Sequence, residues 1–450
     1  MPATDNQSVE TPQSGDHGLV TAAIDVLEGK SKKGPIGRIL PFLGPAIIAS
    51  VAYLDPGNYA TNISAGARYG YMLLWVILAS NLAAMLIQSL SAKLGIASGK
   101  NLAEVMRDHY PPWARFTMWI MMEVVAMATD LAEFLGAALG LYLLFQVPFI
   151  KLGELTGLPV LFIPAILAGI FTFLILALER TGFRSLEIVI GVFVGVIAFS
   201  YLIETIMEKP DWGQIVYHSL VPQFSGTESV LLAAGILGAT VMPHAIFLHS
   251  GLTQGRIVTR EPRLMKRLFR FEVIDVLIAM GIAGLVNMAM LIMAAATFHA
   301  SGLHNVATIE DAYKTLVPLL GAAASFIFAL SLFASGQSSS TVGTMAGQIM
   351  MQGFIHRQIP VWIRRILTML PTFIVILLRF DPTVTLVISQ VLLSFGLPFA
   401  VIPLVYFTQR KDIMGVLTNQ RVTTIISSII AALIIALNIF LLYETLRGGG

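Results

Sequence analysis

The stretch that decides the fold is LPFLGPAIIASVAYLDPGNYATNISAGARYGYMLLW, residues 40–75, in which DPGN at 55–58 interrupts an otherwise apolar run. A carboxylate at the centre of a bilayer costs about 2.5 to 3.5 kcal/mol on insertion scales. Pro56 adds a break in the hydrogen-bond ladder of the helix. Two such costs at one position indicate a functional site in the middle of a membrane span.

The composition is that of a polytopic membrane protein. Of the 450 residues, 56% are hydrophobic and 12% are charged, whereas soluble domains carry about 25% charged residues. Because a span needs about 20 predominantly apolar residues, the sequence predicts eleven spans. They cover residues 41–67, 71–93, 116–146, 159–178, 186–207, 227–251, 270–298, 317–353, 362–379, 383–407 and 421–446.

The positive residues predict the orientation of the chain in the plasma membrane. If the N-terminus is cytoplasmic, all but six of the 28 Lys and Arg residues fall on the cytoplasmic side, as the positive-inside rule requires. The six outside are Arg68, Lys151, Lys209, Lys314, Arg379 and Arg447. This distribution predicts a cytoplasmic N-terminus and an extracytoplasmic C-terminus, and it supports an odd number of spans.

The polar ends of the chain carry no span. Residues 1–33 are rich in Ser, Thr, Asp and Gly and lack the apolar core of a signal peptide, so they are predicted to form a disordered cytoplasmic tail. No Cys occurs, which excludes disulfides and thiolate metal sites. The net charge of +2 indicates no nucleic-acid partner, and neither a bound cofactor nor an obligate protein partner is expected.

A second span is broken in the same way as the first. Residues 235–251 read GILGATVMPHAIFLHSG, so that Met242, Pro243 and His244 interrupt the sixth stretch, five spans after the first break. Because five is odd, the second block of spans inserts with the opposite orientation. Paired interruptions of this kind are typical of inverted-repeat transporters. The alternative, that Pro merely kinks an ordinary span, is kept for the other prolines.

These breaks predict the fold and its division. We expect an all-α membrane protein whose first and sixth helices are broken at mid-membrane. Its five-span repeats cover residues 34–207 and 208–407, and residues 408–450 hold the eleventh span and a C-terminal tail.

The first break indicates a cation as ligand. Asp55 has no Lys or Arg in the same break, and a buried carboxylate without a cationic partner is best explained by a proton or a metal ion that it binds. Asn58, at i+3, can place its amide oxygen on the same helix face. Carbonyl groups freed at the two breaks, those of Ala52 and Ala239, are expected to add further oxygens.

Met242 narrows the choice of metal. A thioether suits Mn²⁺, Fe²⁺, Co²⁺ or Cd²⁺, whereas Mg²⁺ and Ca²⁺ prefer oxygen ligands. The alternative is that Met242 fills the core, as methionine commonly does. Its place beside Pro243 favours the ligand role.

The third span carries a stripe of carboxylates. Glu123, Asp130 and Glu133 lie at i, i+7 and i+10, within an arc of about 80° on one helix face. Such a stripe is either a structural ion-pair cluster or a proton relay. Arg364 and Arg365, at the start of the ninth span, are candidate partners, because a buried carboxylate must be paired or protonated.

Three further polar residues are candidates for the proton pathway. His244 is next to the second break and titrates near neutral pH in its unperturbed state. His249 lies toward the cytoplasmic end of the same span, and Gln88 in the second span is a candidate water-holding neighbour. The alternative for each histidine is a hydrogen-bonded structural role.

The motifs together resemble a known family. DPGN at 55–58, MPH at 242–244 and SGQSSSTVGTMAGQIMMQGF at 335–354 resemble the Nramp family of proton-coupled divalent metal transporters, over about residues 34 to 443. The resemblance implies a LeuT-type fold of eleven spans and uptake of Mn²⁺ and Fe²⁺, with Cd²⁺ and Co²⁺ also accepted, driven by the proton gradient. Nramp-related magnesium transporters lack the methionine at the position of Met242, which points away from Mg²⁺.

The resemblance also implies roles for individual residues. Metal ligands are implied at Asp55, Asn58, Met242 and the Ala239 carbonyl, with Gln390 in SQVLLSFGLPF, residues 389–399, joining when the site closes. A proton relay from Asp55 toward the inside through Asp130 and Glu133 is implied as well.

Together these features predict a symporter in which Asp55 binds metal and takes part in proton release. A passive cation channel is the main alternative, although channels typically present rings of charge through oligomeric symmetry. An intramembrane metalloenzyme is a further alternative, but the sequence has no HExxH motif. The last alternative, a sodium-coupled amino-acid carrier of the same architecture, does not explain the methionine at position 242.

Overall fold

In the computed structural model the chain is helical throughout the residues that the structure describes, which are 17–177, 183–259, 261–303, 308–355 and 359–446, and these ranges contain no strand. Eight helical stretches are long and apolar enough to cross a membrane by length and composition, and two shorter apolar helices, Pro45–Leu54 and Phe162–Ala177, accompany them.

Each of the eleven predicted spans contains helix. In chain order they hold α3 (Pro45–Val51) with η1 (Ala52–Leu54) and α4 (Pro56–Tyr69), α5 (Leu74–Ser98), α7 (Pro112–Leu144), α9 (Phe162–Ala177), α10 (Phe183–Glu208), α12 (Gly226–Thr240) with α13 (Pro243–Gln254), α14 (Pro262–Ala294), α16 (Ala322–Ile355), α17 (Val361–Leu377), α18 (Pro382–Thr408) and α20 (Arg421–Leu446).

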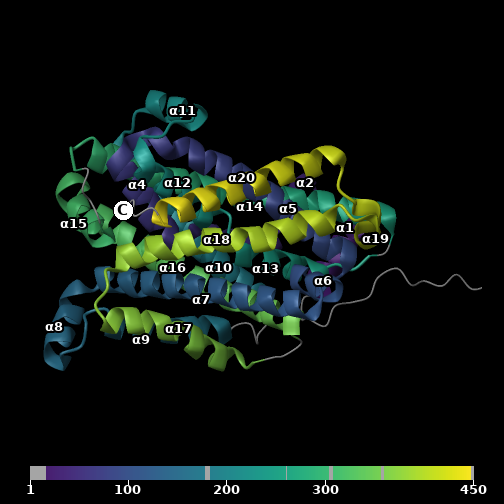
Figure 1. Cartoon of the computed structure of the whole chain (residues 1–450), viewed down its shortest axis with the longest axis horizontal. Helices are drawn as coiled ribbons and strands as arrows, with labels where there is room; N and C mark the ends of the chain where they lie inside the picture. Colours follow the sequence, from purple (N-terminus) through teal and green to yellow (C-terminus); the bar gives the residue numbers. More distant parts are fainter. Residues whose placement is uncertain (1–16, 178–182, 260, 304–307, 356–358, 447–450) are drawn as a thin grey trace, which may run out of the picture.

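Shorter elements connect or extend the spans. They are α1 (His17–Glu28), α2 (Pro35–Ile39), η2 (Gly70–Leu73), α6 (Leu102–His109), α8 (Gln146–Thr156), α11 (Trp212–Leu220), the π-helix η4 (Ala295–His299), α15 (Ile309–Leu320), α19 (Lys411–Met414) and η5 (Gly415–Leu417). Helices α8, α11 and α15 lie at one end of the long axis, and α1, α6 and α19 lie at the other (Figure 1).

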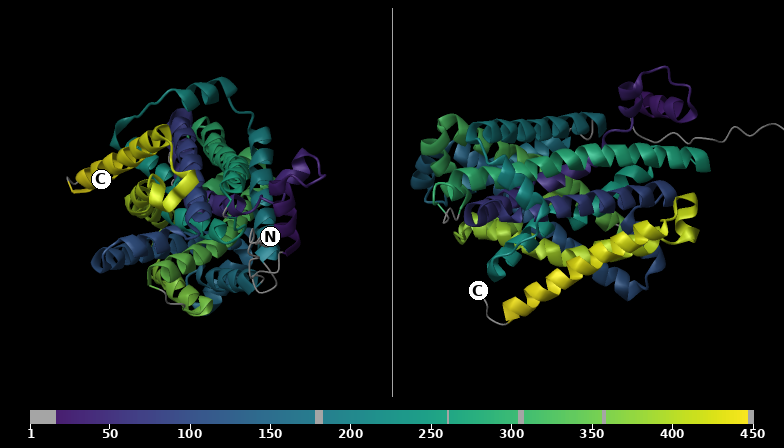
Figure 2. Two further views of the ribbon diagram at one scale, coloured as in Figure 1. Left: turned by 90° about the vertical axis from the view of Figure 1, so that its right-hand side faces the viewer. Right: turned by 90° about the horizontal axis from the view of Figure 1, so that it is seen from above.

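The long helices run side by side along one axis, and the two broken helices lie within the bundle (Figures 1 and 2). The first described helix, α1, and the end of α20 are at opposite ends of this axis. A chain that crosses the bundle an odd number of times must end opposite its start, so this arrangement agrees with eleven spans.

Small residues allow the central helices to approach closely. Along α16 every residue from Ser335 to Gly343 is buried. A Cβ on Gly336 would stand 2.4 Å from the backbone nitrogen of Ala137 on α7, and one on Gly140 would stand 2.5 Å from that of Phe333. Small residues at such contacts are typical of helices that pack inside a membrane. The outer faces, by contrast, expose large apolar side chains such as Leu174 and Leu433.

Two expectations about segment boundaries were wrong. Residues 17–28 of the predicted disordered tail form α1, whose Ala23, Val26 and Leu27 pack with Phe42 and Leu268. Apolar residues at helical spacing within a polar segment account for this folding, because their burial stabilises the helix.

The eighth span begins later than expected. Gly321, at φ +93°, ends α15 and separates it from α16, which starts at Ala322 rather than at residue 317. Glycine adopts this backbone conformation without strain, so it can turn the chain between two helices that read as one apolar run.

Candidate metal centre

The first break is an N-cap built by the DPGN motif. Asp55 has extended backbone angles, φ −78° and ψ 163°, and its Oδ1 accepts a hydrogen bond of 2.9 Å from the backbone N–H of Asn58. Pro56 occupies the first helical position of α4, where its missing N–H removes no hydrogen bond and its fixed φ suits the helix. The carboxylate is thereby held at the positive end of a half-helix.

The two prolines free one carbonyl at each break. In an α-helix the carbonyl of residue i accepts from the N–H of residue i+4. Residue i+4 is Pro56 for Ala52 and Pro243 for Ala239, and proline has no N–H. The carbonyl oxygens of Ala52 and Ala239, which were predicted to ligate the metal, therefore cannot accept the regular hydrogen bond of the helix.

The second break brings a sulfur ligand instead of a charge. Helix α12 ends at Thr240 and α13 starts at Pro243, while Met242 adopts extended angles between them and caps no backbone group with its side chain. Met242 is fully buried. Because its thioether satisfies no helix end, it is available to a metal ion.

Asn58 is held by a residue that the sequence analysis did not single out. Its Nδ2 donates to Oδ1 of Asn287 on α14 at 2.9 Å, and Nδ2 of Asn287 donates to the Tyr53 carbonyl at 2.7 Å. Oδ1 of Asn58 has no partner among the described residues. The signal for Asn287 is one amide within the apolar run of α14, which needs partners in a membrane.

Gln390 of α18 stands between the two breaks. Its Nε2 donates to Oδ2 of Asp55 at 2.9 Å, and its Oε1 finds no partner in the described part of the chain. A Cβ on Gly57 would overlap the Gln390 side chain, and a Cβ on Gly238 would stand 2.4 Å from the Gln390 backbone oxygen. Both glycines are therefore required for α18 to reach the two half-helices.

The centre is enclosed and chemically mixed. Asp55, Asn58, Met242 and Gln390 are each at most 1% exposed. The structure thus gathers a carboxylate, two amide oxygens without partners and a nearby break that carries a thioether. Such a set can coordinate a dehydrated divalent transition metal, which accepts both oxygen and sulfur.

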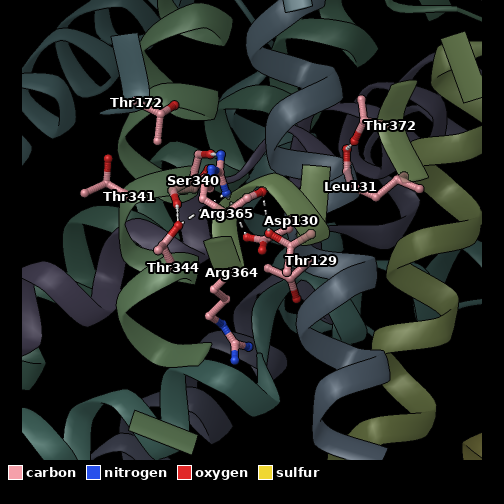
Figure 3. A network of polar contacts seen from close by, with 12 residues as sticks. Thr129, Asp130, Leu131, Thr172, Ser340, Thr341, Thr344, Arg364, Arg365 and Thr372 are labelled. Atoms are coloured by element: carbon pink, nitrogen blue, oxygen red, sulfur yellow. Dashed lines mark hydrogen bonds and ion pairs between the residues drawn. The ribbon is translucent and has the colours of Figure 1, made fainter. Parts of the chain in front are cut away.

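The carboxylate stripe of α7 pairs with the arginines of α17. Arg364 binds both carboxylate oxygens of Glu123, at 3.1 and 2.9 Å. Nη1 of Arg365 binds Oδ1 of Asp130 at 3.1 Å, and the same guanidinium donates to Thr344 and to Ser340 on α16 (Figure 3). Both candidate partnerships are therefore present.

Glu133 differs from its two neighbours on the stripe. Within the described ranges neither of its oxygens has a hydrogen-bond partner, although the side chain is fully buried. A Cβ on Gly343 of α16 would stand 2.4 Å from Oε2 of Glu133 and 3.1 Å from Oδ1 of Asp130. The glycine thus makes room for two carboxyl groups side by side, and among the described residues Asp130 is the one of the two that pairs with an arginine.

The two histidines of α13 occupy separate networks. Nδ1 of His244 lies 3.3 Å from the Thr129 hydroxyl on α7, next to Asp130. Nδ1 of His249 lies 2.9 Å from Oε1 of Gln88, and Nε2 of Gln88 donates to the Tyr53 hydroxyl at 2.6 Å. Gln88 therefore bridges His249 to the residue two positions before Asp55.

A polar cluster at the start of α3 was not anticipated. Oδ2 of Asp275 accepts from the N–H groups of Gly44 and Ala46, at 3.2 and 2.9 Å, and so caps the half-helix. Arg256 binds Glu187 at 2.7 Å beside them. Gly44 has φ +150°, and a Cβ there would stand 2.3 Å from the Glu187 carboxylate. These charges lie on three separate segments, so their meeting depends on the tertiary fold.

Two half-helices that meet on a buried ligand set within paired repeats define the class of inverted-repeat secondary transporters. The chain belongs to the Nramp family. The family profile described as "Natural resistance-associated macrophage protein-like" matches residues 46–444. The chain is 53% identical over 439 residues to the divalent metal cation transporter MntH of Deinococcus radiodurans, covering 98% of each chain. It is 52% identical to MntH of Bacillus subtilis, covering 95% of this chain and 97% of that one.

Solved structures agree with this membership. The manganese transporter of Eremococcus coleocola superposes with a TM-score of 0.80 at 32% identity, covering 91% of this chain and 88% of that one. The nucleobase-cation-symport-1 transporter Mhp1 shares the fold with a TM-score of 0.57 at 13% identity, covering 85% and 82%. The predicted LeuT-type fold of two five-span repeats and an eleventh span is thereby confirmed.

Proposed function

We propose that the protein imports divalent transition metals, foremost Mn²⁺ and Fe²⁺, together with protons, by alternating access around the centre between α3–α4 and α12–α13. The observation that carries the proposal is the hydrogen bond between Asp55 and Gln390 in an enclosed site that also holds Asn58 and Met242. The MntH relatives are divalent metal cation transporters by name, and the Eremococcus relative is a manganese transporter.

Each residue of the centre has a role in this proposal. Asp55 supplies the negative charge, Asn58 and Gln390 supply neutral oxygens, and the Ala52 and Ala239 carbonyls complete the oxygen set. Met242 supplies the sulfur that favours a transition metal over Mg²⁺. When Gln390 turns its Oε1 toward the metal, its Nε2 no longer occupies the carboxylate, so binding of metal and closure of α18 are coupled.

The protons leave along α7. Metal binding displaces the proton from Asp55. Glu133, which has no hydrogen-bond partner in the described structure, is suited to accept this proton, because protonation makes the buried side chain neutral. Asp130, paired with Arg365, continues the route. Glu123 and Arg364 form its ion-paired end, and His244 and the Gln88–His249 pair line the second break.

We take the orientation and the repeat boundaries of this proposal from the sequence predictions. The N-terminus lies in the cytoplasm and the C-terminus outside the plasma membrane, and the repeats cover residues 34–207 and 208–407. This division places one broken helix first in each repeat. The protein acts on a gradient and carries out no chemical conversion, so the bilayer and the transported ions are its partners.

Uptake into proteoliposomes tests the proposal. With an inwardly directed proton gradient, we expect saturable Mn²⁺ uptake accompanied by acidification of the lumen, because the carrier moves both ions. Glu133→Gln should reduce acidification more than Mn²⁺ binding, since Gln keeps the volume but cannot carry a proton. The control is Glu154→Gln, which changes an exposed carboxylate on α8.

The main alternative, a passive channel, makes a different prediction. A channel gives Mn²⁺ flux that does not saturate and no acidification that depends on Mn²⁺. Either result in wild-type proteoliposomes would exclude the symport mechanism.

A further inference from the structure

A second pair of carboxylates lies away from the Asp55 centre, near the end of α10. Glu204 and Glu208 lie at positions i and i+4 and therefore share one face of the helix. Glu204 is fully buried, and its two carboxylate oxygens have no hydrogen-bond partner in the described ranges, whereas Glu208 interacts with the Thr297 hydroxyl. No ion pair that the structure describes includes either residue.

Three buried hydroxyl groups surround the carboxylates. They belong to Tyr201 on α10, Tyr59 on α4 and Thr297 on the π-helix η4; Tyr59 interacts with Tyr201, and Thr297 interacts with Glu208. The rings of Tyr59 and Tyr201 pack edge to face with centroids 5.6 Å apart. Glu204 lies within electrostatic range of both tyrosines, and Glu208 lies within range of Glu204. The five oxygen-bearing side chains of this cluster thus come from three elements.

A cavity leads to this cluster from the end of the bundle that carries α11. Its volume is about 470 Å³, and Glu208 forms part of its wall together with Asp211, His218 and His299. Lys209 lines the same cavity. The nearby Arg68 is already paired with Glu228. The cavity therefore reaches the side chain of Glu208, whose two carboxylate oxygens are buried.

The energetics of the cluster call for a positive ligand. Burying one ionised carboxylate costs several kcal/mol, and a like charge one helical turn away adds repulsion. A cation relieves both costs and also satisfies the hydroxyl oxygens. Because all five donors are oxygens, the cluster suits hard divalent ions and lacks the sulfur that the Asp55 centre offers.

We propose that Glu204 and Glu208, with the hydroxyls of Tyr59, Tyr201 and Thr297, form a second divalent-cation site that is buried behind the cavity and does not select Mn²⁺ against Mg²⁺. The cavity opens at the end predicted to be extracytoplasmic, so the site collects cations on the side from which they are imported. That last role rests on the proposed function, whereas the binding itself does not.

Binding of MnCl₂ to the purified full-length chain, followed by the electron paramagnetic resonance of free Mn²⁺, tests the site. In a chain that carries Asp55→Asn and Met242→Ala, one Mn²⁺ should still bind, and further substitution by Glu204→Gln and Glu208→Gln should abolish it. An excess of Mg²⁺ of about hundredfold should displace this ion. Glu154→Gln, at the same end of the bundle, is the matched control and should leave binding unchanged.

Two outcomes would overturn the proposal. One is the absence of Mn²⁺ binding in the chain with Asp55→Asn and Met242→Ala, which would mean that Glu204 and Glu208 are neutral acids. The other is binding that persists after both glutamates are replaced. Failure of transport with this binding intact would instead count against the Asp55 centre, so the two proposals fail separately.

Thermal denaturation gives a second measurement, which does not depend on detecting free Mn²⁺. Mn²⁺ and Mg²⁺ should both raise the melting temperature of the chain with Asp55→Asn and Met242→Ala, because a ligand that binds the folded state stabilises it. The chain with Glu204→Gln and Glu208→Gln should melt higher without metal and respond less to Mg²⁺. A melting temperature that no divalent ion changes would contradict the site.

Discussion

The two broken helices of this protein solve the same structural problem with different chemistry. At the first break Asp55 caps the following half-helix, accepting from Asn58 at 2.9 Å, and also binds Gln390. At the second break Met242 occupies the corresponding position and caps nothing. Both breaks place a proline at the first position of the following helix.

This difference between the breaks suggests that the first supplies the negative charge of the centre and the second its metal selectivity. The first break carries the carboxylate and the hydrogen bonds that hold it, so it decides whether a cation binds. The second break carries the neutral thioether of Met242, which caps no helix end. In the proposed centre this thioether would determine which cation binds. In the proposed centre two similarly broken helices would therefore offer one ion two unlike ligands, a carboxylate and a thioether.

Loss of the charge at the first break should have the largest effect. Asp55→Asn keeps a side chain that can cap α4 but removes the only carboxylate of the centre, so Mn²⁺ uptake should fall by more than about 100-fold. Uptake in proteoliposomes and the melting temperature measure function and folding separately. Full metal uptake by Asp55→Asn would refute the assignment of charge to the first break.

Loss of sulfur at the second break should change selectivity more than rate. Met242→Ala should weaken Cd²⁺ binding by about tenfold, or about 1.4 kcal/mol, while Mg²⁺ binding should improve relative to Mn²⁺. Calorimetric titration of the wild type and the variant with Mn²⁺, Cd²⁺ and Mg²⁺ measures this. Unchanged discrimination against Mg²⁺ would remove the selectivity role from the second break.

The two glycines next to Gln390 should respond in different ways. Gly238→Ala places a Cβ 2.4 Å from a backbone oxygen, which cannot move alone, so the free energy of unfolding should fall by about 1 to 3 kcal/mol. For Gly57→Ala the three atoms nearest the added Cβ all belong to the Gln390 side chain, which can move, so metal affinity should fall more than stability.

Thermal melting and Mn²⁺ titration of both glycine variants distinguish these effects. Gly255→Ala is a suitable control, because a Cβ at that position meets nothing within 4 Å. Equal losses of stability in Gly57→Ala and Gly238→Ala would mean that the two breaks hold Gln390 in the same way.

The smallest effect is expected at the contact between α7 and the second break. Thr129→Val keeps the side-chain volume and removes the 3.3 Å contact with Nδ1 of His244, so the free energy of unfolding should fall by about 0.5 to 1.5 kcal/mol. Because this loss of stability is small, Mn²⁺ uptake should stay within about twofold of the wild type. A larger loss of uptake would show that His244 and not Met242 dominates the second break.

Much of the fold could be predicted because membrane spans are encoded locally. Eleven apolar stretches and two interruptions depend only on hydropathy and on proline chemistry, and each stretch contains helix in the structure. The turn at Gly321 between α15 and α16 was not predicted, because a glycine with positive φ inside an apolar run changes the path of the chain without changing its hydropathy. Helix α1 escaped because its stability comes from packing against Leu264 and Leu268, far along the chain.

The site could be predicted only in part, for a related reason. DPGN and MPH contain their own prolines, so the positions of Asp55 and Met242 and the free carbonyls of Ala52 and Ala239 follow from the local sequence. The arginine pairs of α7 could be proposed but not assigned, since several carboxylates compete for two guanidinium groups. Asn287 and Asp275 went unnoticed because neither has a partner within its own helix.

The sequence by itself therefore determined where the membrane helices run, where two of them break and which unlike ligands stand at the breaks. These properties depend on hydropathy, proline and residue type, which act within a few residues. Only the tertiary structure decided that Gln390 binds Asp55, that Glu133 has no hydrogen-bond partner among the described residues and that Glu208 lines a cavity. Such contacts join helices far apart in the chain, and close packing of small residues sets their distances.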